Sequence, residues 1–382
     1  MISIVSKGSI RFINVSKSIS QRSNTLPSKV YYNSLPSNAE LAILGMQPVQ
    51  TRFFSEKVTT ARRMDTSIGG YIRGFNQFTK IKLGVLNTIV TFTTYLVKGG
   101  SICLFDCVML AAGTQMMAMA SQGLNQIIEV EQDKKMNRTR SRPMPQGKFS
   151  KVQAYAITAA LYGGSNLVLG YWFPFSSVFV ANSIFWSYIL CYTPLKRVSE
   201  LNTPIGAVVG SLTAYLGWTA AGGSLLSLTP WWIFFYTFSW QFAHFYGILW
   251  TYKDDYKKAG FVMLQDSQKA CNIMRAALAG QVASVGGIYA VGAIDPLSAA
   301  LSWYLLYKYN YRPMKEFEKS DSKTNAHKLT IYSYIPFTTI FVLIYLNLVA
   351  KTFGIDKKIE EYLGQFLPKQ FRKGEPAAQA EK

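Results

Sequence analysis

Charged side chains are scarce in this sequence and unevenly placed. The 382 residues include 40 basic and 20 acidic side chains, and none lies between Lys151 and Lys196 or between Glu200 and Lys253. These gaps hold 44 and 52 residues. Because about 20 apolar residues cross a bilayer, each gap accommodates two membrane helices joined by a short turn. A disordered or fibrous chain is excluded, and the sequence predicts a polytopic protein of the lipid bilayer.

Cysteine is also rare, and its spacing excludes two further classes of protein. No pair among the four cysteines has C-x-x-C spacing, and all four lie in apolar segments or at the start of one: Cys103, Cys107, Cys191 and Cys271. Neither a disulfide framework nor a zinc site is therefore predicted. No nucleic-acid partner is expected.

The N-terminal region lacks acidic residues. The first 39 residues contain ten serines and five basic residues, and no acid precedes Glu40. A secretory signal would need an unbroken apolar core of about seven to fifteen residues, whereas lysine and arginine recur every few positions here. The composition favours a mitochondrial transit peptide over 1–39, the alternative being a plain basic tail. Residues 40–79 are predicted to be a basic segment lying against the matrix side of the membrane.

The windows poor in charge predict an all-α membrane domain over 80–350, followed by a C-terminal tail over 351–382. We expect nine transmembrane helices, at 83–99, 104–128, 152–171, 174–193, 204–222, 229–250, 271–293, 296–310 and 329–350.

Basic residues are confined to one set of loops. Nine crossings place the N-terminus and the loops after helices two, four, six and eight on the same face of the membrane. Those loops carry 20 lysine and arginine residues, whereas the loops of the other face carry Lys98 alone. The positive-inside rule orients the basic face inward. With a transit peptide ahead of it, the chain is predicted to be a multi-pass protein of the mitochondrial inner membrane, with its active site facing the matrix.

A motif of acids and arginines closes the second predicted helix. Asn125, Glu129 and Asp133 are four residues apart, so on an α-helix they share one face over about 12 Å. Mg²⁺ prefers such oxygen ligands together with phosphate oxygens, and the guanidinium groups of Arg138 and Arg142 can bind phosphate bidentately. The alternative is a set of i,i+4 ion pairs at a helix end. Because the carboxylates begin inside an apolar helix, where ionisable groups tend to mark function, we favour a metal–diphosphate site.

A second acidic position, Asp255, closes the sixth predicted helix on the same membrane face. It lies 122 residues after Asp133, and we expect the two acidic clusters to meet across a central cavity. His244, one of two histidines in the chain, precedes Asp255 by two to three helical turns. A single helix histidine is more often a packed residue than a ligand, so the residues alone do not assign it a catalytic role.

Four motifs in this chain resemble those of a known family. The run from Asn125 to Pro143, N-x-x-x-E-x-x-x-D-x-x-M-x-R-T-x-x-R-P, is similar to the first acidic motif of the UbiA-type intramembrane prenyltransferases. Three segments narrow the resemblance to the protohaem IX farnesyltransferases (haem O synthases): Tyr192-Thr-Pro-Leu-Lys196-Arg197 with Asn202-Thr203-x-x-Gly206, Trp240-Gln241-x-x-His244-Phe245, and Asp255-Tyr256-x-x-Ala259-Gly260-x-x-Met263-Leu264. The resemblance extends over roughly 80–350.

This resemblance implies a nine-helix UbiA-type prenyltransferase bundle that depends on Mg²⁺. The implied reaction transfers the farnesyl group of farnesyl diphosphate to a vinyl carbon of haem B and gives haem O, a step in haem A biosynthesis and cytochrome c oxidase assembly. The implied metal ligands and catalytic residues are Asn125, Glu129, Asp133 and Asp255. The implied substrate-binding residues are Lys80, Arg138, Arg142, Lys196, Arg197, Trp240 and Gln241.

His244 is the residue that the resemblance assigns to the haem side of the site, as an orienting or iron-contacting catalytic group. The family usually has proline before this histidine, whereas this chain has Ala243, which weakens the expected kink. A downstream haem A synthase and further copies of the chain are the expected protein partners.

Two other functions stay open on the sequence. A UbiA-type enzyme acting on a quinone precursor such as 4-hydroxybenzoate would share the first motif and its mechanism, although segments 192–197 and 240–245 argue against it. A multi-helix transporter would also place charged residues at a cavity, but near the bilayer midplane and within broken helices. Here the acids cluster at one interface beside arginines, which favours an enzyme.

Overall fold

The computed structural model describes residues 3–6, 9–12 and 67–355. It divides into two units, Met1–Thr60 and Ala61–Lys382. In the first unit, strands β1 (Ser3–Ser6) and β2 (Ser9–Phe12) pair antiparallel. The rest of the predicted transit peptide, most of segment 40–79 and nearly all of the C-terminal tail lie outside the described residues.

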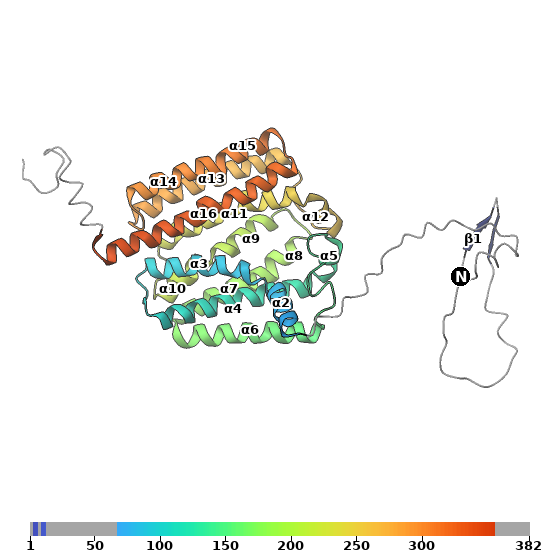
Figure 1. Ribbon diagram of the computed structural model, residues 1–382, viewed down its shortest axis with the longest axis horizontal. Coiled ribbons are helices and arrows are strands. Elements are labelled where there is room, and N and C mark those ends of the chain that lie inside the picture. The colour runs from blue at the N-terminus through green and yellow to red at the C-terminus, as the bar shows by residue number, and fades with distance from the viewer. Residues whose placement is uncertain (1–2, 7–8, 13–66, 356–382) are drawn as a thin grey trace, which may run out of the picture. The chain divides into compact units, whose positions relative to one another are not determined.

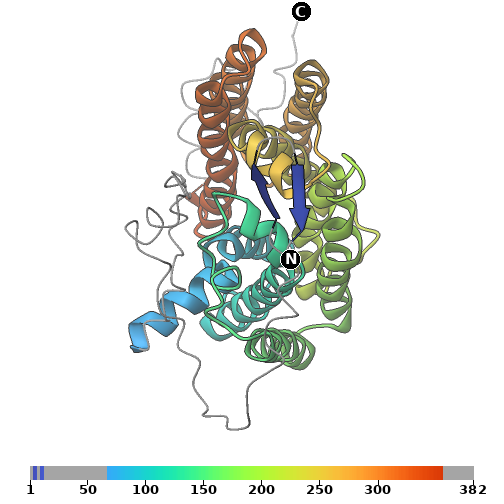
Figure 2. The ribbon, with the colours of Figure 1, turned by 90° about the vertical axis from the view of Figure 1, so that its right-hand side faces the viewer.

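The regular elements of the described part of the second unit are all helices, and the long helices run side by side (Figure 1), seen end-on in Figure 2. Its elements are α2 (Ile68–Thr79), α3 (Ile81–Val97), α4 (Leu104–Ile128), α5 (Val130–Lys135), α6 (Lys151–Trp172), α7 (Phe175–Trp186), η2 (Ser187–Tyr192), α8 (Thr193–Leu195), α9 (Asn202–Ser211), α10 (Thr213–Ala220), α11 (Thr229–Thr251), α12 (Lys253–Ala259), α13 (Ser267–Ala290), α14 (Pro296–Leu306), η3 (Tyr307–Tyr311), α15 (Arg312–Lys319) and α16 (Lys323–Thr352).

Every predicted span coincides with a helix or a run of helices in this described part. The second span is α4 itself, and the sixth differs from α11 by one residue. By length and composition, three helical segments are long and apolar enough to cross a membrane: Leu104–Ile128, Phe175–Leu195 and Lys323–Thr352. The all-α fold is therefore confirmed, whereas the number of crossings remains a prediction.

Two π-helical turns interrupt the bundle, and a proline follows each. The backbone N–H of Thr193 bonds to the carbonyl of Tyr188, and that of Arg312 bonds to the carbonyl of Tyr307, both five residues back. Because the next residue in each case is proline, which has no N–H to donate, the helix changes its hydrogen-bond register there instead of ending. Single π-turns are frequent at functional sites, and η2 leads directly to the predicted site.

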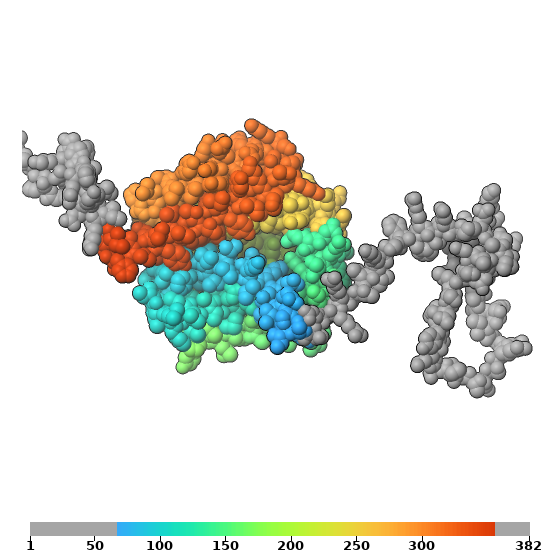
Figure 3. All heavy atoms as spheres, in the orientation of Figure 1, coloured from blue at the N-terminus to red at the C-terminus, as the bar shows by residue number. Residues whose placement is uncertain are grey.

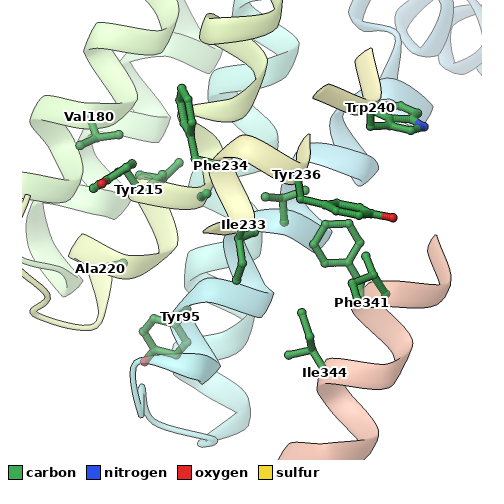
Figure 4. Packing of buried hydrophobic residues seen from close by; sticks show 14 of the residues in the cluster. Tyr95, Val180, Tyr215, Ala220, Ile233, Phe234, Tyr236, Trp240, Phe341 and Ile344 are labelled. Carbon is green, nitrogen blue, oxygen red and sulfur yellow. The ribbon is translucent and has the colours of Figure 1, made fainter. Parts of the chain in front are cut away.

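The core between the helices is rich in aromatic rings (Figure 4). Tyr236 and Phe341 are buried there, and their rings meet edge to face at 6.5 Å. Helix α10 approaches α3 closely at Gly217, where a Cβ would lie 1.7 Å from the carbonyl oxygen of Thr91. A larger residue at this position would force the two helices apart.

The outer flanks of the bundle are apolar as well. Leu167, Leu190, Leu297 and Leu346 expose 75%, 65%, 79% and 59% of their surface. Exposed apolar area on this scale marks a membrane or protein contact, and it accords with insertion into a bilayer. Helices α5, α8 and α12 lie together at one end of the bundle (Figure 1), and the space-filling view shows one flank of this unit (Figure 3).

Candidate active site

The first acidic motif spans a break in the backbone. Helix α4 ends at Ile128, and Glu129 is its C-cap with φ −98° and ψ 16° before α5 begins. The helical repeat nonetheless continues, since Glu129 N donates to Asn125 O at 2.9 Å and Asp133 N donates to Glu129 O at 2.8 Å. Asn125, Glu129 and Asp133 are only 2%, 4% and 2% exposed. Three oxygen-bearing side chains are thus buried together at one end of the bundle.

Basic groups of the chain compensate both buried carboxylates. Arg142 Nη1 donates to both oxygens of Asp133, at 2.9 and 2.8 Å. Lys196 Nζ forms an ion pair with Glu129 Oε1 at 2.5 Å, although Oε1 receives no properly directed hydrogen bond. Because an uncompensated buried carboxylate is costly, these pairs explain how the acidic motif tolerates its burial.

Asp255 on α12 links the second acidic motif to the first. Its carboxylate is 6% exposed and accepts hydrogen bonds from the backbone N–H of Arg138 at 3.1 Å and from Asn137 Nδ2 at 3.2 Å. The Arg138 guanidinium lies over the rings of Tyr252 and Tyr256, 5.3 and 5.9 Å from their centroids. The loop that follows α5 is therefore held on α12, and it brings the two acidic motifs to the same end of the bundle.

Within 67–355 and the two short strands, no three or more histidine, cysteine, aspartate or glutamate side chains group closely enough to hold a metal ion. The carboxylates of Glu129, Asp133 and Asp255 instead have separate partners within the chain. The donor set still suits a hard cation, because it consists of oxygens. Glu129 Oε1 in particular is buried and anionic, and although Lys196 Nζ lies 2.5 Å away it receives no properly directed hydrogen bond.

A cavity of about 280 Å³ lies inside the bundle, between α3, α4, the α7–η2 segment, α9, α10 and α11. Most of its wall is apolar. Its polar lining residues are Asn87, Thr114, Ser121, Gln122, Tyr188, Tyr192, Thr203, Thr213, Gln241 and His244. An apolar cavity with a few polar groups is the usual form of a site for a largely apolar ligand.

Lys80 reaches a wall residue of this cavity from the joint between α2 and α3. It is the described non-glycine residue with positive φ, at 48°, and its ammonium donates to Gln122 Oε1 at 2.9 Å. The hydroxyl of Tyr188 donates to the same oxygen at 3.4 Å. Burial lowers the pKa of Lys80 well below its ordinary value, and the nearby Arg142 lowers it further. An anion bound beside Lys80 would raise this pKa.

Segment 192–197 places Lys196 beside the acidic side chains of the first motif. The ring of Tyr192 packs on Gly206, where a Cβ would lie 2.7 Å from the ring, which explains a glycine at that position of the motif. Lys196 Nζ lies 4.7 Å from the centroid of the Tyr192 ring while it pairs with Glu129. Arg197, by contrast, is exposed and donates to the carbonyl of Ile128 at 3.2 Å.

Segment 240–245 contributes one packed residue and two residues that line the cavity. Trp240 is 6% exposed, donates from Nε1 to the Ser333 carbonyl at 2.9 Å and stacks on Phe337 at 3.8 Å; it is not among the residues lining the cavity. Gln241 lines the cavity and donates to the Ala207 carbonyl at 2.9 Å. His244 lines it too.

Sequence reasoning missed several residues of the site. Gln122 lies three residues before Asn125, and as a buried amide in an apolar helix it carried the signal that marks function in membranes. Asn137 lies in a charged loop that offers no such signal, and its bond to Asp255 depends on the folded chain. Tyr188 belongs to an aromatic-rich run in which no single ring stands out.

Comparison with known proteins identifies the family and the fold. A model of the UbiA prenyltransferase family matches residues 86–334. Protoheme IX farnesyltransferase of Christiangramia forsetii is 30% identical over 308 residues, covering 79% of this chain and 99% of that protein. The human protein named protoheme IX farnesyltransferase, mitochondrial, is 37% identical over 193 residues, covering 49% of this chain and 42% of its own length.

Solved structures show the same fold at low sequence identity. A UbiA homolog from Aeropyrum pernix superposes with a TM-score of 0.57 at 18% identity, covering 71% of this chain and 98% of its own. A UbiA homolog from Archaeoglobus fulgidus bound to DMAPP and Mg²⁺ has a TM-score of 0.53 at 12% identity, covering 71% and 99%.

An all-helical bundle with buried acids and paired bases at one end and an apolar cavity inside is the architecture of an intramembrane prenyltransferase. The chain belongs to the UbiA prenyltransferase family, and within it to the protoheme IX farnesyltransferases.

Proposed function

We propose that this protein transfers the farnesyl group of farnesyl diphosphate to a vinyl group of haem B, giving haem O. The observation that carries the proposal is the pair of buried carboxylates, Glu129 and Asp133, which form ion pairs with Lys196 and Arg142 at one end of the bundle. From the same end Lys80 donates to Gln122, which lines the apolar cavity. Such an arrangement suits a substrate with a diphosphate head and a long apolar chain.

The charged end of the site binds the leaving group. Lys80, Arg138, Arg142 and Lys196 supply positive charge to the diphosphate, which takes the electron pair as its bond to farnesyl C1 breaks. Stabilising charge that develops in the transition state is commonly the largest single contribution to catalysis. Arg138 is already fixed by its contacts with Tyr252 and Tyr256, so its guanidinium needs little reorganisation.

Asn125, Glu129 and Asp133 from one side, and Asp255 from the other, are the residues that would hold Mg²⁺. When bound, the ion neutralises part of the charge on the diphosphate. The fit rests on the buried oxygen atoms of these side chains, among them Glu129 Oε1, which pairs with Lys196 but receives no properly directed hydrogen bond. The Archaeoglobus fulgidus UbiA homolog is bound to DMAPP and Mg²⁺, which supports the choice of Mg²⁺ as the metal.

The apolar wall of the cavity protects the farnesyl cation from water until the vinyl group attacks. The vinyl π-electrons form the new bond to C1, water adds its oxygen to the resulting cation, and a proton leaves. His244 and Gln241, both on α11 and both lining the cavity, are the residues we assign to the haem side. The aromatic Trp240 behind them supports His244 rather than touching substrate.

The same proposal places the enzyme in the mitochondrial inner membrane with nine crossings and a matrix-facing site. It rests on the transit-peptide composition of residues 1–39, on the basic loops, and on relatives whose names include "mitochondrial". A haem A synthase that consumes the product, and further copies of this chain, remain predicted partners.

The test is an acceptor competition with the purified full-length chain in nanodiscs, given farnesyl diphosphate, Mg²⁺ and equal amounts of haem B and 4-hydroxybenzoate. Mass spectrometry should find hydroxyethylfarnesyl haem and no prenylated benzoate. Asp255→Asn should lose product, whereas the neighbouring Asp254→Asn, an exposed residue paired with Lys323, should keep it. Prenylated benzoate as the main product would replace this function with the quinone-precursor alternative.

A further inference from the structure

Two side chains of α16 hold the imidazole of His244. Nδ1 lies 3.3 Å from the hydroxyl oxygen of Ser333, and Nε2 lies 3.3 Å from the hydroxyl oxygen of Tyr334. The imidazole also stacks on Trp240, with ring centroids 4.7 Å apart and planes 20° apart. Both nitrogens and one face of the ring are thus engaged, so its orientation is fixed before any ligand arrives.

The directions of these hydrogen bonds follow from the number of available protons. Ser333 has one hydroxyl proton, and its closest acceptor is the carbonyl of Thr330, at 2.8 Å. With its proton on the Thr330 carbonyl, the Ser333 oxygen is left to accept toward His244, and this arrangement calls for an N–H on Nδ1. A neutral imidazole has one N–H, so Nε2 carries the lone pair. The Tyr334 hydroxyl donates to that lone pair.

We propose that Ser333 is a positioning residue that fixes His244 as the Nδ1–H tautomer, and that Tyr334 occupies the Nε2 lone pair until haem iron takes its place. Ser333 is fully buried, so water does not compete with His244 for hydrogen bonds to the Ser333 hydroxyl. Nε2 is then the atom of His244 that coordinates the iron. This inference rests on the proposed function only in naming haem as the ligand.

The two hydroxyls have opposite effects on haem binding. Ser333 assists it, because a single tautomer leaves Nε2 always free of a proton. Tyr334 opposes it, because its hydrogen bond must break before the iron can approach. A neutral hydrogen bond of this kind changes an equilibrium by about 2-fold to 12-fold, so Tyr334→Phe should tighten haem binding by that factor. Ser333→Ala should weaken it.

The tautomer can be measured directly because the chain has only two histidines. The full chain carrying His327→Gln, an exposed position, is labelled with ¹⁵N-histidine and studied by nitrogen NMR in nanodiscs without haem. We expect a protonated Nδ1 and an unprotonated Nε2. A protonated Nε2 would overturn the proposal. This spectrum needs no core variant, so it decides the tautomer even if a Ser333 variant does not fold.

Matched variants then test the role of each hydroxyl. Ser333→Ala should populate both tautomers, whereas Ser284→Ala, which removes another buried hydroxyl bonded to a helix carbonyl at 2.7 Å, should keep one. A single tautomer in Ser333→Ala would show that Ser333 does not fix the ring.

Titration with haem B should show tighter binding in Tyr334→Phe, and equal or weaker binding would show that Tyr334 does not compete with iron. If the protein forms no haem O, the proposed function is overturned. An Nδ1–H tautomer found in that same protein would leave this inference in place.

Discussion

The ion pair between Lys196 and Glu129 offers a sharp test of the charged site, through the variant Lys196→Met. The two side chains are 8% and 5% exposed, and the charged atoms are 2.5 Å apart. At an effective dielectric constant of about 20, Coulomb attraction over that distance is about 7 kcal/mol, which is largely offset by the cost of removing both charges from water. Removing the ammonium alone leaves a buried, uncompensated carboxylate, which typically costs about 3–5 kcal/mol.

We therefore expect Lys196→Met to lower the free energy of unfolding by about 3–5 kcal/mol, measured from tryptophan fluorescence during reversible unfolding in mixed micelles. The double variant Lys196→Met/Glu129→Leu should recover most of that loss. Lys269→Met provides the control, because it breaks the pair with Glu200 whose partners are 52% and 40% exposed, and such pairs contribute less than about 1 kcal/mol. Equal losses in Lys196→Met and Lys269→Met would refute the description of a buried, coupled pair.

Three further predictions concern the metal site, its pH dependence and the orientation of the chain. Asp133→Asn should abolish haem O formation in a correctly inserted protein, while Glu131→Gln, an exposed position 67% open to solvent, should leave it unchanged; activity in Asp133→Asn would exclude its role. Because the pKa of Lys80 is lowered, its ammonium loses its proton at a lower pH than an ordinary lysine. Affinity for farnesyl diphosphate should therefore fall as the pH rises through the pKa of Lys80, and Lys80→Arg should flatten this pH dependence. An affinity that does not change with pH in the unmodified protein would contradict the role of Lys80. In intact mitoplasts an impermeant thiol reagent should label the exposed native Cys103 but not a cysteine introduced at position 320, and the opposite pattern would reverse the orientation.

Hydropathy predicted where the helices lie but not always where they end. The eighth span was expected to stop at residue 310, yet the helical run continues through η3 and α15 to Lys319. Lys308, Arg312 and Lys315 interrupt the apolar window there, although charged residues form helices readily and Pro313 only changes the hydrogen-bond register. For the same reason α16 begins at Lys323, six residues before the predicted span.

The spacing of the acidic motif predicted that Asn125, Glu129 and Asp133 would lie on one face, because spacing along a helix determines the face. It could not predict the break at Glu129, which depends on the local backbone angles. Nor could it predict that Asp255 would bind the backbone of Arg138, since a contact across more than a hundred residues is set by the packing of the bundle. The hydroxyls around His244 come from α16, a helix without any motif, and only the folded chain reveals them.

Haem extraction from cells decides whether this chain forms haem O. The full chain is expressed in a yeast strain that lacks its own haem O synthase, and extracted haems are analysed by mass spectrometry beside the same strain carrying Asp133→Asn. Hydroxyethylfarnesyl haem in the first strain and only haem B in the second is the predicted result. Haem B alone in both strains, with the protein inserted in the inner membrane, would show that this chain does not form haem O.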